Sequence, residues 1–99
     1  MRARAGSPAQ AHAGVDASRA RAGAAEQPDD VASQTLVADL DLLGGDVDEA
    51  FSRLIELVRR SAGDERDAAR KHLVEMFNVV GDEDPRVLKA RQSLANALF

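Results

Sequence analysis

The feature that most restricts the fold is a run of four amphipathic segments between Gln27 and Phe99. In each segment apolar residues recur every three or four positions, which places them on one face of an α-helix. The segments are separated by residues that end or start helices, such as Gly81 and the pair Asp84-Pro85. The pattern therefore predicts an all-α fold. The predicted helices span residues 28–43, 46–60, 64–80 and 85–99.

Local signals predict how these helices begin. We expect Pro28 at the first position of the first helix, where its missing N–H is not needed. We expect Asp46 to cap the second helix, with Glu49 completing an acidic form of the capping box. The acidic cluster at residues 82–84 precedes the fourth helix, so we interpret it as charge at a helix start rather than a divalent-cation site.

The apolar faces predict the core. The three aromatic residues, Phe51, Phe77 and Phe99, all fall at positions that suggest burial. Because a chain of 99 residues buries only a modest share of its surface, helix packing must supply nearly all of its stability. The predicted buried side of the last helix consists of Val87, Leu88, Leu94, Ala95 and Leu98.

Residues 1–27 differ in composition from the rest of the chain. Their only large apolar residues are Met1 and Val15, and most of the others are Ala, Arg, Gly, Ser and Gln. Alanine favours helix in residues 16–25, but without an apolar stripe such a helix has no face for docking. We therefore expect a disordered arm over residues 1–27 and a four-helix domain over residues 28–99.

The connections between the four predicted helices are short. Short connections make consecutive helices pack antiparallel, as helical hairpins. We therefore expect two stacked hairpins. The first, over residues 28–60, has about the 34-residue length of a tetratricopeptide repeat.

Composition excludes several classes of function. The net charge is −4, and residues 28–99 carry −6 while residues 1–27 carry +2, a distribution opposed to nucleic-acid binding by the helical part. The chain contains no cysteine, so it has no disulfide, thiolate metal site or redox motif. Because no apolar run is long enough to span a membrane and no secretory signal is recognisable, we expect a cytoplasmic protein without a membrane partner. The abundance of Ala, Arg and Gly beside a single Ile is typical of GC-rich bacterial genomes.

Candidate chemistry is sparse. His12 and His72 are the only histidines, and neither has a second ligand at the spacing of a metal site. No arrangement of Ser, His and acid resembles a catalytic triad, and no glycine-rich phosphate loop occurs. We therefore expect neither catalytic residues nor a cofactor or metal.

Two pairs of cations are the candidate partner-docking residues: Arg59 with Arg60, and Arg70 with Lys71. Stacked hairpins would bring them to one edge, which would suit an acidic partner segment. The alternative is that the first pair balances the negative end of its helix and the second pair is a solvated face.

From Pro28 onward, the chain resembles a degenerate tetratricopeptide repeat. The motifs that carry this resemblance are Pro28-Asp29-Asp30, Ala38-Asp39, Leu43-Gly44-Gly45-Asp46 and Glu49-Ala50-Phe51. Ala38 and Ala50 fall where such repeats place small residues so that two helices approach closely. Three residues depart from the pattern, in which an aromatic, a tyrosine and a proline are usual: Gln34, Asp41 and Ala62.

The later part of the chain resembles the C-terminal helical domain of YbbN-type thioredoxins, the co-chaperones also called chaperedoxins. The resemblance covers about residues 28–99. The motifs that carry it are Leu57-Val58-Arg59-Arg60, Asp64-Glu65, Ala69-Arg70-Lys71, Leu73, Phe77, Gly81, Asp84-Pro85, Arg91, Leu94-Ala95 and Ala97-Leu98-Phe99.

This resemblance implies a protein-interaction module that binds unfolded clients or other chaperones. The thioredoxin fold that precedes the helices in that family has no counterpart in residues 1–27, so we expect a detached or truncated helical tail without redox activity. Two alternatives remain open: a truncated enzyme of the thioredoxin family, which the missing cysteines oppose, and a structural domain that self-associates.

Overall fold

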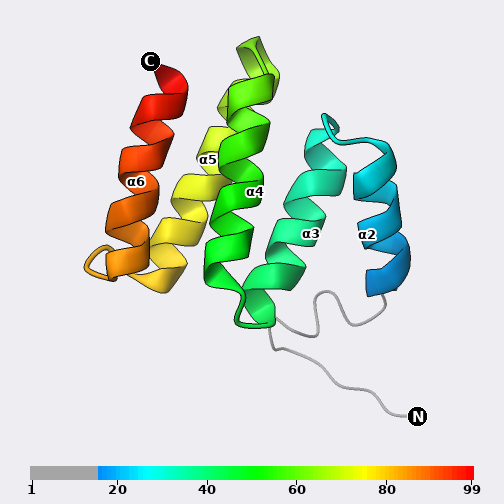
Figure 1. Cartoon of the computed structure of the whole chain (residues 1–99), viewed down its shortest axis with the longest axis horizontal. Helices are drawn as coiled ribbons and strands as arrows, with labels where there is room; N and C mark the ends of the chain where they lie inside the picture. Colours follow the sequence, from blue (N-terminus) through cyan, green and yellow to red (C-terminus); the bar gives the residue numbers. More distant parts are fainter. Residues whose placement is uncertain (1–15) are drawn as a thin grey trace.

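The computed structural model describes residues 16–99, and within this range every regular element is an α-helix. The all-α prediction is therefore confirmed. Consecutive helices run in opposite directions and are joined by short turns (Figure 1). Residues 1–15, where most of the expected arm lies, are outside the described range. The helices are α2 (Ala17–Glu26), α3 (Val31–Leu43), α4 (Val47–Arg60), α5 (Gly63–Val80) and α6 (Pro85–Leu98).

Helix α2 differs from the expectation of an unstructured arm. Ala17–Glu26 forms a helix whose first turn is capped by Asp16, since the backbone N–H of Arg19 donates to the Asp16 carboxylate over 3.2 Å. The helix packs against α3 and buries Ala24. The expectation failed because it required an apolar stripe for docking, whereas polar contacts hold α2 in place.

Helices α3, α4 and α6 each follow an aspartate, whereas α5 begins at Gly63, after Ala62 and one residue before the predicted start. Asp84 caps α6 and Pro85 occupies its first turn, as predicted. Helix α3 begins at Val31 rather than at Pro28, because Asp30 is its cap and accepts a hydrogen bond from the Ser33 N–H at 2.9 Å. The Asp30 and Asp84 side chains thus each satisfy a free backbone N–H.

The predicted capping box at the start of α4 does not form. Asp46 precedes the helix, but its side chain makes no capping hydrogen bond. Its backbone N–H instead donates to the carbonyl oxygen of Asp41 over 2.8 Å, which closes the turn after α3. Gly45 completes that turn with a φ of 91°, a conformation that glycine adopts without strain.

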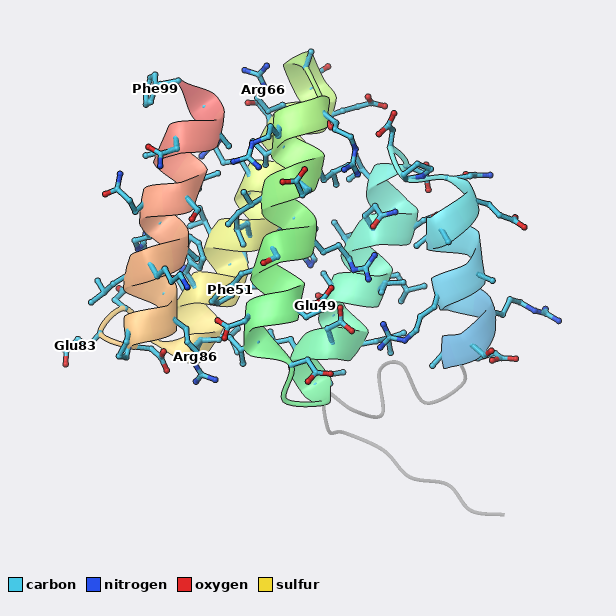
Figure 2. All side chains as sticks on the ribbon, in the orientation of Figure 1. Glu49, Phe51, Arg66, Glu83, Arg86 and Phe99 are labelled. Carbon is cyan, nitrogen blue, oxygen red and sulfur yellow. The ribbon has the colours of Figure 1, made fainter. Side chains whose placement is uncertain are left out.

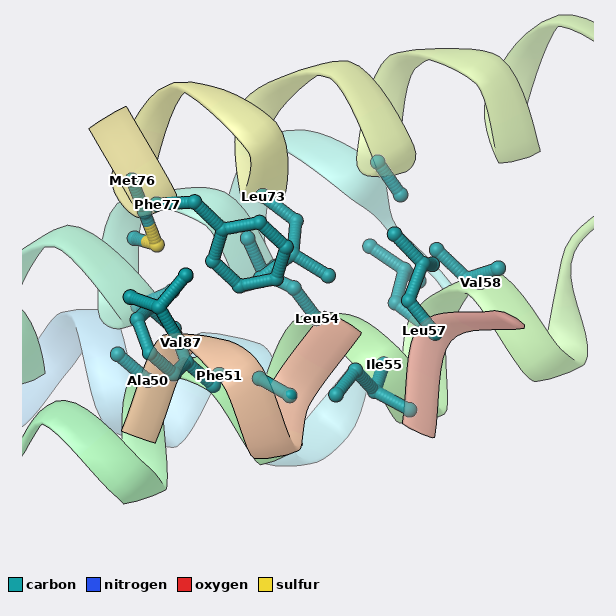
Figure 3. Close-up of a cluster of buried hydrophobic side chains, with 14 of the residues drawn as sticks. Ala50, Phe51, Leu54, Ile55, Leu57, Val58, Leu73, Met76, Phe77 and Val87 are labelled. Carbon is teal, nitrogen blue, oxygen red and sulfur yellow. The ribbon is translucent and has the colours of Figure 1, made fainter. Parts of the chain in front are cut away.

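Helix α4 is the centre of the packing and lies against α3, α5 and α6. Although α6 follows α5 directly, α6 packs mainly on α4. Close-packed side chains fill the space between these helices (Figure 3). The buried apolar residues of this core are Ala38, Val47, Ala50, Phe51, Leu54, Ile55, Leu57, Val58, Ala69, Leu73, Met76, Phe77, Val87, Ala90 and Leu94.

Phe77 joins three helices within this core. Its ring meets that of Phe51 edge to face, with centroids 5.0 Å apart and planes at 84°. The guanidinium of Arg91, on α6, lies over the Phe77 ring, 4.9 Å from the centroid. Arg91 also donates to Asp82 over 2.9 Å, so a cation links α6 to both the core and the turn before it.

Two residues predicted to be buried lie on the surface. Leu88 is 57% exposed, and Phe99 is fully exposed beyond the end of α6 (Figure 2). Both predictions were wrong. Leu88 is exposed because α6 turns only one face toward α4, and Val87, Ala90 and Leu94 occupy that face, whereas Phe99 is exposed because it follows the last residue of the helix.

Candidate protein-docking groove

The residues that depart most from the repeat pattern form a buried polar network on α3. Gln34 and Asp41 are 3% and 2% exposed, respectively. The side-chain amide of Gln34 donates to the Ala24 carbonyl oxygen at 2.8 Å, and its oxygen accepts from Arg53 Nη1 at 2.9 Å. One residue of α3 thus connects α2 on one side with α4 on the other.

Asp41 makes the same kind of bridge about two helical turns further along α3. Its carboxylate lies 2.8 Å from Arg21 Nη1 of α2 and accepts from Arg53 Nε at 3.4 Å. A buried carboxylate is tolerated when it is paired and hydrogen-bonded, and Asp41 has a cation on each side. We call Arg21, Gln34, Asp41 and Arg53 the polar latch.

A third connection lies at the opposite end of α2. Arg60, in the last turn of α4, donates to Asp29 Oδ1 at 2.8 Å and to the Pro28 carbonyl oxygen at 2.7 Å. These bonds hold the turn between α2 and α3 against the end of α4. They are partly exposed, so each contributes modestly to stability.

A groove of about 310 Å³ runs between α2 and α4, which flank α3 in Figure 1. One wall is formed by the small side chains of α2, and the other is charged and belongs to α4, from which Glu49 projects (Figure 2). We call this the α2–α4 groove. Its lining residues are Ala24, Ala25, Pro28, Gln34, Glu49, Ser52, Arg53, Glu56 and Arg60.

A second, smaller groove of about 180 Å³ lies on the other side of α4, against α6. Phe51, Ile55 and Ala90 contribute its apolar residues, and Arg86 and Lys89 supply positive charge. Ser52 lines both grooves, so the two depressions adjoin along the exposed face of α4.

Asp84 forms an ion pair with Arg86, which lines this second groove. The Arg86 side chain donates to both carboxylate oxygens, at 3.0 and 2.8 Å, and the Arg86 backbone N–H donates at 2.8 Å. These hydrogen bonds, the side-chain ones first, lower the pKa of Asp84 from 3.8 to about 2. Arg86 is therefore partly neutralised by its neighbour.

The four cations expected to dock a partner occupy different environments. Arg60 lines the α2–α4 groove, and Arg59 pairs with Glu56 one turn earlier on α4. Arg70 and Lys71 line a separate depression on the exposed surface of α5, together with acidic residues of that helix. A docking role for all four remains a prediction.

His72 and its surroundings point to a structural contact. Its Nε2 lies 2.7 Å from Asp39 Oδ1, which links α5 to α3, and both side chains are 29% exposed. Within residues 16–99, no group of three or more His, Asp or Glu side chains is arranged to hold a metal ion. His12 lies outside the described residues.

The latch residues were not predicted as a site, although the sequence contained a signal for two of them. Gln34 and Asp41 are polar residues at positions where tetratricopeptide repeats usually bury aromatic ones. A polar residue at a core position indicates a buried hydrogen-bond partner, but its identity depends on which helix lies opposite. Arg21 and Arg53 carried no signal, because surface arginines are common in helices.

Stacked pairs of antiparallel helices joined by short turns are typical of helical-repeat proteins. A tetratricopeptide repeat family model matches residues 10–99, and the chain belongs to that family. Domains of this family mediate binding to other proteins, and their fold is typically non-enzymatic. Of the helices in residues 16–99, none has the length and apolar character needed to cross a membrane.

Related curated proteins come from mycobacteria. Uncharacterized proteins of Mycobacterium bovis and of two strains of Mycobacterium tuberculosis are each 45% identical to this chain over 71 residues, which is 72% of this chain and 23% of each relative. The chain thus spans less than a quarter of the length of these relatives. No solved structure matches it significantly.

Proposed function

We propose that this chain is the protein-binding part of a co-chaperone related to the YbbN-type thioredoxins, and that it holds unfolded client segments or a chaperone partner in the cytoplasm. The observation that carries the proposal is the α2–α4 groove, which combines a wall of small side chains with a charged wall. An extended or helical segment fits against small residues, while Glu49, Glu56 and Arg60 offer polar contacts along it.

The mixed charge of the groove favours a partner segment with both apolar and charged residues. Along α4 the charges alternate in sign, and each charged residue lies about one helical turn from the next. The four residues, in order, are Glu49, Arg53, Glu56 and Arg60. Unfolded polypeptide segments carry such mixtures without a fixed sequence. Charged walls then orient the segment, and the small residues of α2 allow its side chains to approach closely.

The exposed position of Ser52 allows a sharp test. Ser52→Arg places a bulky side chain at an exposed position on the face shared by both grooves. Asn78→Arg adds the same side chain to an exposed position of α5 and is the matched control. The measurement is suppression of aggregation of a heat-unfolded model enzyme, followed by light scattering at several chain concentrations.

We expect the wild-type chain and Asn78→Arg to suppress aggregation equally, and Ser52→Arg to lose most of this activity. Capture of chaperones or unfolded clients from a mycobacterial lysate should follow the same order. If neither the wild-type chain nor the control suppresses aggregation or captures such proteins, the co-chaperone proposal is wrong. Light scattering of the chain alone then tests self-association, in which Leu88 and Phe99 supply exposed apolar surface.

A further inference from the structure

The surface that α2 covers on α3 differs in character from the main core. Gln34, Val37 and Asp41 recur at helical spacing on one face of α3, and all three are buried. Val37 is fully buried yet is not a member of the main hydrophobic cluster. Two of these three residues are polar and bind α2 directly, so this interface is largely a hydrogen-bonded one.

Helix α2 contributes little apolar surface to this interface. Ala24 is its only buried residue, and Gly23 in its middle weakens the helix. A helix of 10 residues is not stable in isolation, so α2 stays helical only while it is docked. Undocking and unfolding of α2 are therefore one event.

Opening of α2 takes Ala24 away from the Gln34 amide but leaves the Asp41 carboxylate and the Gln34 side-chain oxygen paired with Arg53. When Arg21 departs, Arg53 still donates to Asp41 and to the Gln34 side-chain oxygen. No buried charge loses its last partner, which keeps the free energy of opening low. Arg60 continues to hold Pro28 and Asp29 against α4, so the turn before α3 acts as a hinge.

We propose that α2 is a displaceable wall of the α2–α4 groove, which undocks as a unit while α3 to α6 remain folded. Undocking removes Ala24 and Ala25 from one side of the groove and uncovers Val37 and the Gln34 amide for a bound segment. A role for α2 opening in partner binding rests on the proposed function. The opening of α2 itself is independent of that function.

The absence of cysteine from the chain provides a direct test. Ala24→Cys places a single thiol under α2, and Ala69→Cys places one in the core on α5; the native alanines are 2% and 0% exposed, respectively. We expect a thiol reagent to label Ala24→Cys at least about tenfold faster than Ala69→Cys. The thiol under α2 is exposed by local opening, whereas the thiol in the core is exposed only by global unfolding.

Adding Arg21→Ala to the Ala24→Cys variant should raise the labelling rate about two- to fivefold, the range for loss of a partly exposed ion pair. Arg19→Ala is the matched control, since Arg19 lies on the same helix and its side chain is exposed. Equal labelling of the two cysteine variants, or equal effects of the two arginine variants, would overturn the proposal.

Hydrogen exchange of the unmodified chain tests the same opening without a cysteine, which could itself disturb the packing of α2 on α3. We expect amides of residues 20–26 to exchange at least about tenfold faster than the central amides of α4. Equal protection in both helices would contradict local opening. Rapid exchange in α2 combined with failure to suppress aggregation would support the opening of α2 and contradict the co-chaperone function. Slow exchange in α2 combined with suppression of aggregation would contradict the opening and support the co-chaperone function of a rigid groove.

Discussion

Helices α2 and α4 show two different ways of holding a helix in a small domain. Helix α2 has a capping bond from Asp16, whereas the residue before α4, Asp46, makes none. Yet α4 buries seven side chains among three neighbouring helices, and α2 buries only Ala24. Local capping contributes about 1 kcal/mol, while each large buried side chain contributes about 1.5–3 kcal/mol. Packing rather than local signals therefore decides which helix is the stable one.

The difference also separates two tasks within one chain. The core around α4 is apolar and close-packed, so it resists opening and supplies most of the stability. The α2 interface is polar and adjoins the groove, so it opens at lower cost. Binding elements are commonly drawn from the less stable parts of a fold, which agrees with the place of the groove beside α2.

The largest expected loss of stability comes from a substitution in the core around α4. Leu54→Ala removes a fully buried side chain from the centre of the core and should lower the free energy of unfolding by about 2–5 kcal/mol. Urea denaturation followed by circular dichroism measures this change. Leu88→Ala, at a 57% exposed position of α6, is the control and should change stability by about 0.5 kcal/mol or less. Similar losses for both variants would mean that α4 does not dominate the packing.

An intermediate effect is expected where the two regions meet. Asp41→Asn keeps the shape of the side chain but removes the charge that binds Arg21 and Arg53, so stability should fall by about 1–3 kcal/mol. Glu75→Gln, the same chemical change at an exposed position of α5, should have little effect. Urea denaturation gives the size of the loss, and hydrogen exchange of α2 should rise in Asp41→Asn alone. Unchanged exchange of α2 would show that the polar latch does not hold it.

The smallest effect concerns a helix cap outside both regions. Because the Arg86 hydrogen bonds lower the pKa of Asp84 to about 2, this cap stabilises the folded state fully above pH 4. Its contribution is lost as the pH falls from about 4 to 2, where the carboxylate becomes protonated. A carboxyl NMR titration should therefore give a midpoint near 2 for Asp84. A midpoint near 3.8, the ordinary value, would show that the pairing with Arg86 is absent in solution.

Much of the fold was predictable because its signals are local. The stops at Gly45 and Gly81 and the start at Asp84-Pro85 depend on a few adjacent residues, and each lies where the sequence indicated. The grooves were less predictable. Arg60 was expected to dock a partner and does line the α2–α4 groove, but nothing in the sequence indicated that Ser52 lies between two depressions.

The sequence by itself determined that the chain is all-α and where most of its helices begin and end, because helical periodicity and capping act over a few residues. Only the tertiary structure decided that Ala17–Glu26 packs against α3 and that Leu88 is exposed. It also decided that Gln34 and Asp41 are buried with hydrogen-bond partners. These outcomes depend on which faces of distant helices meet. A polar residue shows that it needs a partner, but only packing brings Arg21 and Arg53 to Asp41.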